Sequence, residues 1–181
     1  MLKEIQHVLA TADLIYSENQ VEAALDNLAA AINTALAATN PLVLCVLNGG
    51  IIAAGKLITR LTMPLTLDSI NATRYQNQTS GGTIQWELKP TTPLLGRTVL
   101  IVDDVLDEGI TLAAIKDYCL EQGAKEAYTA VLVDKQLDHD KPIHADFVGL
   151  EVENRYLFGY GMDYKGYLRN AAGIYACNED S

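Results

Sequence analysis

The fold of this chain is decided by one stretch, Val99-Leu100-Ile101-Val102-Asp103-Asp104-Val105-Leu106-Asp107-Glu108-Gly109-Ile110-Thr111-Leu112. Its first four residues form an unbroken apolar run of the kind that makes a strand buried on both faces. Two adjacent acids end the run, a third acid lies in the short loop that follows, and a helical pattern begins at Leu112. The stretch therefore predicts a strand, an acidic turn and a helix N-terminus, as in an open α/β sheet.

The loop after this strand suits a phosphorylated sugar. Ligands of open α/β sheets bind outside the carboxyl ends of the strands, and the free N–H groups of a helix N-terminus favour a phosphate. Gly109 lets the backbone approach a ligand closely, and the Thr111 hydroxyl can donate to a phosphate oxygen. Carboxylates would repel a bare phosphate, so Asp103 and Asp104 indicate a ligand that also carries a diol and Mg²⁺. Asp107 is left facing the reacting group, and the whole loop indicates a ribose 5-phosphate site.

The composition limits the class of protein. With 181 residues, 49% of them hydrophobic and 20% charged, we expect one globular domain over residues 1–181. The formal net charge of -10 argues against nucleic acid or an anionic membrane as a partner. An anionic substrate must therefore be held by helix termini, a few Lys or Arg side chains and a metal ion.

Several features indicate a cytoplasmic protein. The three cysteines stand at scattered spacing without a C-x-x-C pair, which is typical of reduced thiols. The longest apolar runs are too short to span a bilayer, and the first residues lack the pattern of a signal peptide.

Two further segments have features of a binding site. A buried strand over 42–47 runs into Asn48-Gly49-Gly50 and a helix over 51–61, an arrangement that favours an anion but also suits a plain strand-to-helix turn. Residues 71–82 are polar, contain glycine and are too long for a tight turn. They predict a mobile loop, although composition alone would equally describe the tip of a hairpin.

The last third of the chain offers a lysine and an aromatic cluster. Lys135 ends a buried strand over 127–133 and lies over the same crevice as the acids, although such a lysine is more often simply solvated. The segment 156–164 is rich in tyrosine, which can stack on a flat heterocycle or form an edge of the core. His139 and His144 lack a third ligand at metal spacing, so we expect them to be surface residues.

The stretch 99–112 resembles the phosphoribosyl-pyrophosphate (PRPP) motif of type I phosphoribosyltransferases. Receiver domains of response regulators also carry an apolar run that ends in two aspartates, but those acids do not continue into Asp-Glu-Gly-Ile-Thr. The other segments narrow the resemblance to the hypoxanthine-guanine phosphoribosyltransferases, and it covers residues 41–169 with all loops in order. It implies a mostly parallel sheet flanked by helices, with a small hood formed by the N-terminal region and residues after about 135.

The resemblance also implies a role for each loop. The implied residues are Asp107 as the catalytic group; Asp103, Asp104, Glu108, Gly109, Ile110 and Thr111 for PRPP; Leu47, Asn48, Gly49 and Arg169 for pyrophosphate; Lys135, Tyr156, Leu157 and Asp163 for the purine; Arg74 and Tyr75 in a lid loop; and Asp103, Asp104 and Asp163 near Mg²⁺.

Four positions depart from the family pattern. Asn48 stands where Lys is usual, so the pyrophosphate loop brings no charge of its own. Glu108 replaces the usual Ser or Thr, and its carboxylate must point away from the phosphate. Arg74-Tyr75 replaces Ser-Tyr, and Tyr156 stands where Phe is frequent.

The implied activity is transfer of ribose 5-phosphate from PRPP to hypoxanthine or guanine, which gives IMP or GMP and pyrophosphate in purine salvage. The resemblance also implies a homodimer or homotetramer. Two alternatives stay open: a phosphoribosyltransferase for xanthine or another base, and a regulatory protein of the same fold that senses PRPP or a nucleotide. Pyrophosphate release measured with a panel of bases separates them.

Overall fold

The computed structural model describes residues 1–75 and 83–178, which form a large and a small sheet. The large sheet has the strand order β4-β3-β2-β5-β6-β7. Its strands are β2 (Leu42–Val46), β3 (Thr66–Tyr75), β4 (Thr83–Leu88), β5 (Thr98–Leu106), β6 (Glu126–Gln136) and β7 (Phe147–Glu153). Neighbouring strands run parallel except for the antiparallel pair β3 and β4, which confirms the predicted mostly parallel sheet.

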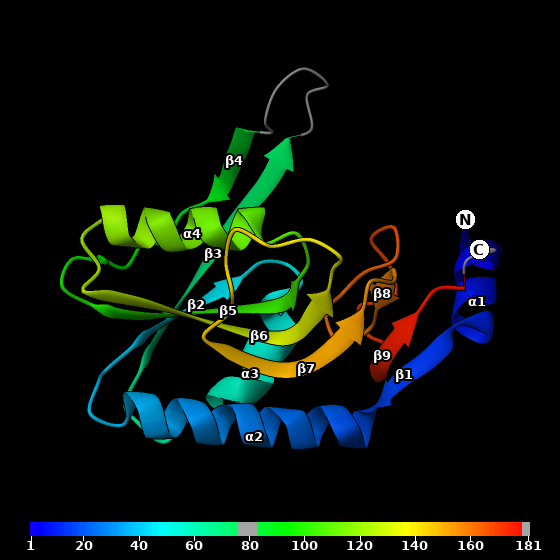
Figure 1. The fold of residues 1–181 in the computed structure, drawn as a ribbon, viewed down its shortest axis with the longest axis horizontal. Coiled ribbons are helices and arrows are strands. Elements are labelled where there is room, and N and C mark those ends of the chain that lie inside the picture. Colours follow the sequence, from blue (N-terminus) through cyan, green and yellow to red (C-terminus); the bar gives the residue numbers. More distant parts are fainter. Residues whose placement is uncertain (76–82, 179–181) are drawn as a thin grey trace.

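Helices cover both faces of the large sheet (Figure 1). Helices α2 (Glu18–Leu36) and α3 (Gly50–Ile58) lie on one face, and α4 (Ile110–Glu121) lies on the other. In β5, Leu100 and Val102 pack into the core beneath α2 and α3, whereas Val99 and Ile101 pack into the core beneath α4. Burial on two faces is why this strand is an unbroken apolar run.

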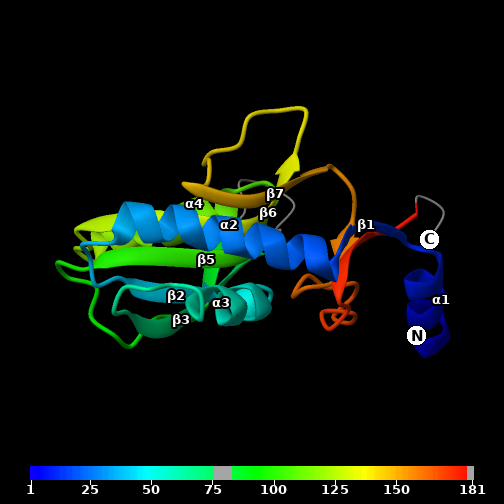
Figure 2. The ribbon, with the colours of Figure 1, turned by 90° about the horizontal axis from the view of Figure 1, so that it is seen from below.

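The small sheet forms the hood at one end of the molecule (Figures 1 and 2). Its order is β1-β9-β8, built from β1 (Asp13–Ser17), β8 (Leu157–Phe158) and β9 (Gly173–Ala176). Helix α1 (Leu2–Thr11) packs there through Ile5 and Val8 against Phe158 and Tyr164. Strand β7 also follows residue 135, but it pairs with β6 in the large sheet.

Three strands are longer than their apolar runs predict. The parallel ladder of β5 and β6 continues through Val105 and Leu106, so Asp103 and Asp104 lie in a strand and the turn begins at Asp107. The ladder of β6 with β7, in which Lys135 pairs with Val152, places Lys135 inside β6. Residues 71–75 belong to β3, because they pair with β4, and not to the predicted loop. The rest of that loop, 76–82, lies outside the described residues.

One negative finding concerns membranes. No helix in the described ranges combines the length and the apolar character that a bilayer crossing requires.

Candidate active site

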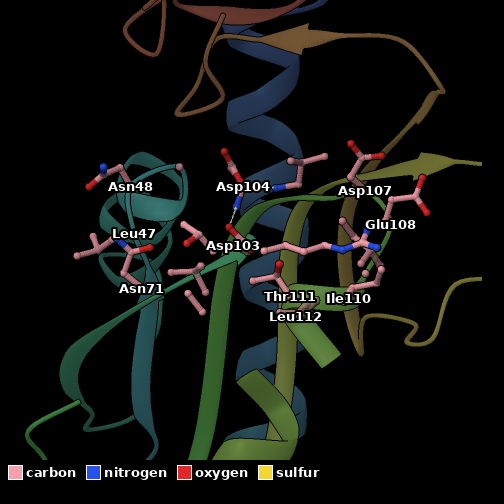
Figure 3. A pocket seen from close by; sticks show the side chains of 18 of the residues that line it. Leu47, Asn48, Asn71, Asp103, Asp104, Asp107, Glu108, Ile110, Thr111 and Leu112 are labelled. Atoms are coloured by element: carbon pink, nitrogen blue, oxygen red, sulfur yellow. Dashed lines mark hydrogen bonds between the residues drawn. The ribbon is translucent and has the colours of Figure 1, made fainter. Parts of the chain in front are cut away.

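A cleft of about 520 Å³ opens at the carboxyl ends of β2 and β5. In Figure 3, Leu47 and Asn48 lie on one side of it, Asp103 and Asp104 in the middle, and Asp107 with Glu108 on the other side. This is the crevice where ligands of open α/β sheets bind. Its lining contains Leu47, Asn48, Gly49, Arg74, Asp103, Asp104, Asp107, Glu108, Gly109, Ile110, Thr111, Asp163 and Arg169.

Asp103, which is half-buried, and Asp104, which is buried, form a carboxylate pair. The Asp104 N–H donates to Asp103 Oδ1 at 2.8 Å, and the Val105 N–H donates to Asp104 Oδ1 at 2.8 Å. Burial raises the pKa of both side chains, and the neighbouring Asp104 charge raises the pKa of Asp103 further. Two desolvated carboxylates fit a ligand that brings a cation or hydroxyl donors.

The donor chemistry at this pair fits Mg²⁺, which prefers oxygen ligands. Among residues 1–75 and 83–178, no three His, Cys, Asp or Glu side chains are grouped as metal ligands. Mg²⁺ usually keeps several waters and binds one or two carboxylates together with substrate phosphates.

The predicted phosphate loop caps helix α4. Gly109 has φ +78° at the N-cap, and a side chain there would approach Ile143 Cγ2 to 3.1 Å, so glycine is needed for both reasons. The first bond of the helix runs from the Ala113 N–H to the Gly109 carbonyl at 2.9 Å. The N–H groups of the first turn therefore have no partner within the helix and, with the helix dipole, form an anion site.

The predicted pyrophosphate loop is tightly enclosed. A Cβ on Gly49 would lie 2.0 Å from Asp104 Oδ2, and a Cβ on Gly161, where φ is +108°, would lie 2.0 Å from the Gly49 carbonyl oxygen. Arg169 closes this side, because it donates to the Gly161 carbonyl at 2.6 Å and pairs with Asp163 at 2.7 Å. Only glycine fits at either close approach.

A smaller cavity of about 230 Å³ adjoins the cleft. Asp104, Val105, Asp107 and Asp163 line both spaces, and the far wall of the smaller one consists of Lys135, Tyr156, Leu157 and Met162. The Lys135 ammonium donates to Asp107 Oδ2 at 2.8 Å, and the lysine side chain is 11% exposed. The predicted base-reading lysine therefore lines the smaller cavity and contacts the predicted catalytic aspartate, which lines both cavities.

A family model described as phosphoribosyl transferase domain matches residues 11–165. The chain belongs to this family. It is 31% identical over 158 residues to the hypoxanthine-guanine phosphoribosyltransferase of Bacillus subtilis, covering 87% of this chain and 88% of that one. It is also 31% identical over 175 residues to the hypoxanthine-guanine-xanthine phosphoribosyltransferase of Tritrichomonas foetus, covering 94% and 90%.

A solved structure agrees with these relatives. The crystal structure of a hypoxanthine-guanine phosphoribosyltransferase from Bacillus anthracis superposes with a TM-score of 0.86 at 28% identity, covering 92% of this chain and 98% of that one. The phosphoribosyltransferase fold therefore extends over nearly the whole chain.

Sequence reasoning missed part of the lining of this phosphoribosyltransferase cleft. Glu87 on β4 faces the cleft and accepts hydrogen bonds from Asn71 at 3.0 Å and Thr73 at 3.3 Å. These contacts depend on the register of β3 against β4, which the local sequence does not set. Met162 was also missed, because an apolar side chain inside a tyrosine-rich run gives no distinguishing signal. Of Tyr75, only the backbone at the end of β3 is described.

The phosphoribosyltransferase cleft is strongly acidic. Its described lining includes six acids, Glu87, Asp103, Asp104, Asp107, Glu108 and Asp163, but only two cationic side chains, Arg74 and Arg169. Side-chain charge therefore does not attract a polyanion such as PRPP. The features of this cleft that favour an anion are the backbone N–H groups and the N-terminus of α4.

Proposed function

We propose that this phosphoribosyltransferase transfers the 5-phosphoribosyl group of PRPP to a 6-oxopurine, hypoxanthine or guanine, and releases pyrophosphate. The observation that carries the proposal is the contact of Asp107, which lines both cavities, with Lys135, which lines the smaller one. The names of the relatives, in which hypoxanthine and guanine recur, support purine salvage.

The hydrogen-bonding groups along one edge of a 6-oxopurine match the side chains of Lys135 and Asp107. A 6-oxopurine presents its 6-oxygen, an acceptor, beside the N7 ring nitrogen on a single edge. We assign the Lys135 ammonium to the 6-oxygen and Asp107 to the ring N–H. Binding of the base would replace the present contact of the two side chains by one contact from each to the base. Tyr156 would stack on the ring, and the Leu157 backbone would bond its other edge.

The sugar and both phosphate groups would lie in the larger cleft. We assign the ribose diol to Asp103 and Asp104, and the 5-phosphate to the backbone of the loop from Glu108 to Thr111. Pyrophosphate would lie against Leu47, Asn48 and Gly49, with Arg169 nearby. In Figure 3 the Glu108 carboxylate is directed away from Thr111, as a phosphate in the loop requires.

Mg²⁺ would be held by one or two of the carboxylates assigned to it, Asp103, Asp104 and Asp163, together with oxygens of PRPP. When bound, it supplies charge neutralisation of the pyrophosphate leaving group. Asp107 would take the proton from the ring nitrogen as the bond from purine to sugar forms.

The test is pyrophosphate release by the purified protein with PRPP, Mg²⁺ and, in turn, hypoxanthine, guanine, xanthine and uracil. We expect release with hypoxanthine or guanine. If only xanthine or only uracil supports release, that base is the substrate and the assignment to hypoxanthine or guanine is wrong. PRPP binding without release on any base would favour the regulatory alternative, which the relatives do not support.

We also propose that the protein is cytoplasmic and forms a homodimer or homotetramer, as the family resemblance implies. Light scattering of the purified protein measures the assembly directly. A monomer at micromolar concentration would contradict this part.

A further inference from the structure

The connection between β6 and β7, residues 137–146, packs against the phosphate loop of the candidate active site. It appears in yellow in Figure 1, where it passes beside α4. Pro142 and Ile143 of this connection pack on Gly109, where an ideal Cβ would lie 3.5 Å from Pro142 Cδ and 3.1 Å from Ile143 Cγ2. His139 contacts Glu108, with 3.1 Å between Nε2 and Oε2. One segment thus touches the phosphate loop at two neighbouring positions.

Lys141, in the middle of this connection, is almost fully buried. Its side chain is 7% exposed, and its ammonium donates to Asp134 Oδ1 at 2.6 Å. It also donates to the Leu106 carbonyl at 2.9 Å and to the Lys135 carbonyl at 2.5 Å. An ammonium has three donors, so all of them are used.

The three acceptors lie at the ends of two adjacent strands. Leu106 is the last residue of β5 and pairs with Asp134 of β6 in the parallel ladder. Leu106 also directly precedes Asp107, and the carbonyl of Lys135 belongs to the residue that contacts Asp107. A single buried ammonium therefore fixes the backbone on both sides of the 2.8 Å contact between Asp107 and Lys135.

We propose that Lys141 is a positioning residue that sets the placement of Asp107 relative to Lys135 and so the fit of the purine edge. The proposal rests on the function proposed above. Lys141 does not line either cavity and touches no substrate position. It acts through the backbone at Leu106 and Lys135, whereas the Asp134 carboxylate offsets the cost of burying its charge.

The test compares Lys141→Met with Lys116→Met in the holoenzyme. Methionine keeps an unbranched stem but removes the charge and all three donors. Lys116 on α4 is a matched control, because it also forms an ion pair, with Asp146 at 3.2 Å, but lines neither cavity. The measurements are kcat and KM for hypoxanthine, the Kd of PRPP with Mg²⁺ by calorimetry, and Tm.

We expect Lys141→Met to lower kcat/KM for hypoxanthine by roughly 10- to 100-fold, the scale of an ångström-sized misplacement of catalytic groups. The Kd of PRPP should change by less than about threefold, because the backbone groups that hold PRPP are not bonded to Lys141. Lys116→Met should leave both values within about twofold. Equal losses for hypoxanthine and PRPP, an unchanged kcat/KM, or the same losses in Lys116→Met would overturn the proposal.

A second variant covers the case in which Lys141→Met does not fold. Lys141→Arg keeps the charge beside Asp134, but its planar guanidinium cannot place three donors as an ammonium does. We expect a Tm near that of the natural protein together with reduced kcat/KM for hypoxanthine. Full kcat/KM in Lys141→Arg would overturn the positioning role. If the unsubstituted protein releases no pyrophosphate with any purine, the proposed phosphoribosyl transfer to purines is wrong, whatever the Lys141 variants do.

Discussion

Asp107 is the side chain to which the proposed chemistry assigns a proton transfer. It borders both cavities and contacts the Lys135 ammonium. Asp107→Asn keeps the shape but cannot accept the proton, so we expect kcat to fall by roughly 10²- to 10⁴-fold. Asp117→Asn, an exposed change on α4 outside both cavities, should leave kcat unchanged. Near-normal turnover in Asp107→Asn would remove Asp107 from this role.

Lys135 is assigned to the base rather than to PRPP. Its ammonium lies in the smaller cavity, and Lys135 does not line the larger cleft. Lys135→Ala should therefore lower kcat/KM for hypoxanthine by roughly tenfold or more, the scale of a lost charge-assisted hydrogen bond. The Kd of PRPP, measured by calorimetry, should change much less. Comparable losses in kcat/KM for hypoxanthine and in PRPP affinity would contradict the assignment of Lys135 to the base.

Arg74 is the residue that we expect to compensate for the missing charge at Asn48. Both line the cleft, and the only other arginine in its described lining, Arg169, is paired with Asp163. Arg74→Ser should weaken PRPP binding by roughly tenfold, and Asn48→Lys in that background should restore part of the loss. The Kd of PRPP in the single and double variants provides the measurement. An unchanged Kd in Arg74→Ser would assign the arginine no part in binding.

At the scale of elements, Glu22 connects α2 to α3 and to Tyr160, which follows β8 in the chain. Its carboxylate accepts from Lys56, Tyr160 and Arg60. The hydrogen bond from Lys56, followed by that from Tyr160, lowers the pKa of Glu22 from 4.5 to about 2. A carboxyl group with a lowered pKa in the folded protein stabilises the fold above its unfolded value, and this contribution is lost as pH falls from about 4.5 towards 2.

We therefore expect Glu22→Gln to lower the free energy of unfolding at pH 7 by roughly 1–2 kcal/mol. The effect is limited because the ion pairs of Glu22 with Lys56 and Arg60 are partly exposed to solvent. The difference from the natural protein should shrink as the pH approaches 3. Urea unfolding at a series of pH values measures it, with Glu121→Gln, an exposed acid on α4, as the control. A destabilisation that stays constant from pH 7 to pH 3 would rule out the ionic contribution.

The elements differ in how far the sequence predicts them. Helix α2 follows from its apolar stripe at Val21, Leu25, Leu28, Ile32 and Leu36, all of which are buried. Strands β2 and β5 follow from their apolar runs. The ends of β3 and β6 do not, because polar residues there are held by pairing with a neighbouring strand rather than by burial.

The same distinction applies to the site. The positions of Asp103, Asp107 and Gly109 at the cleft could be predicted, because the three residues lie in one short motif that joins a buried strand to a helix N-terminus. Glu87 and Lys141 could not, because their positions depend on strand pairing and on a loop whose polar sequence has no local pattern. Long-range contacts also build the small sheet, in which Asp13 pairs with Ala176.

At the scale of the whole molecule, we expect the charge of -10 and the acidic cleft to make PRPP binding depend on a metal ion. Calorimetry of PRPP with the natural protein should give a tight Kd with Mg²⁺ and a Kd at least roughly tenfold weaker with EDTA. Asp104→Asn should reduce the difference between the two conditions. Equal affinity with and without Mg²⁺ would contradict the assignment of the buried carboxylates to a cation.

The fold places the cleft at the carboxyl ends of β2 and β5 beside the smaller cavity, which Leu157 of the small sheet helps to line. The most direct test is the rate of pyrophosphate release from PRPP and Mg²⁺ with and without hypoxanthine, compared between the natural protein and Lys135→Ala. We predict release that requires the base and is strongly reduced at the same hypoxanthine concentration in the variant. Release at the same rate with and without hypoxanthine, or equal rates in the two proteins, would contradict a single site shared by Asp107 and Lys135.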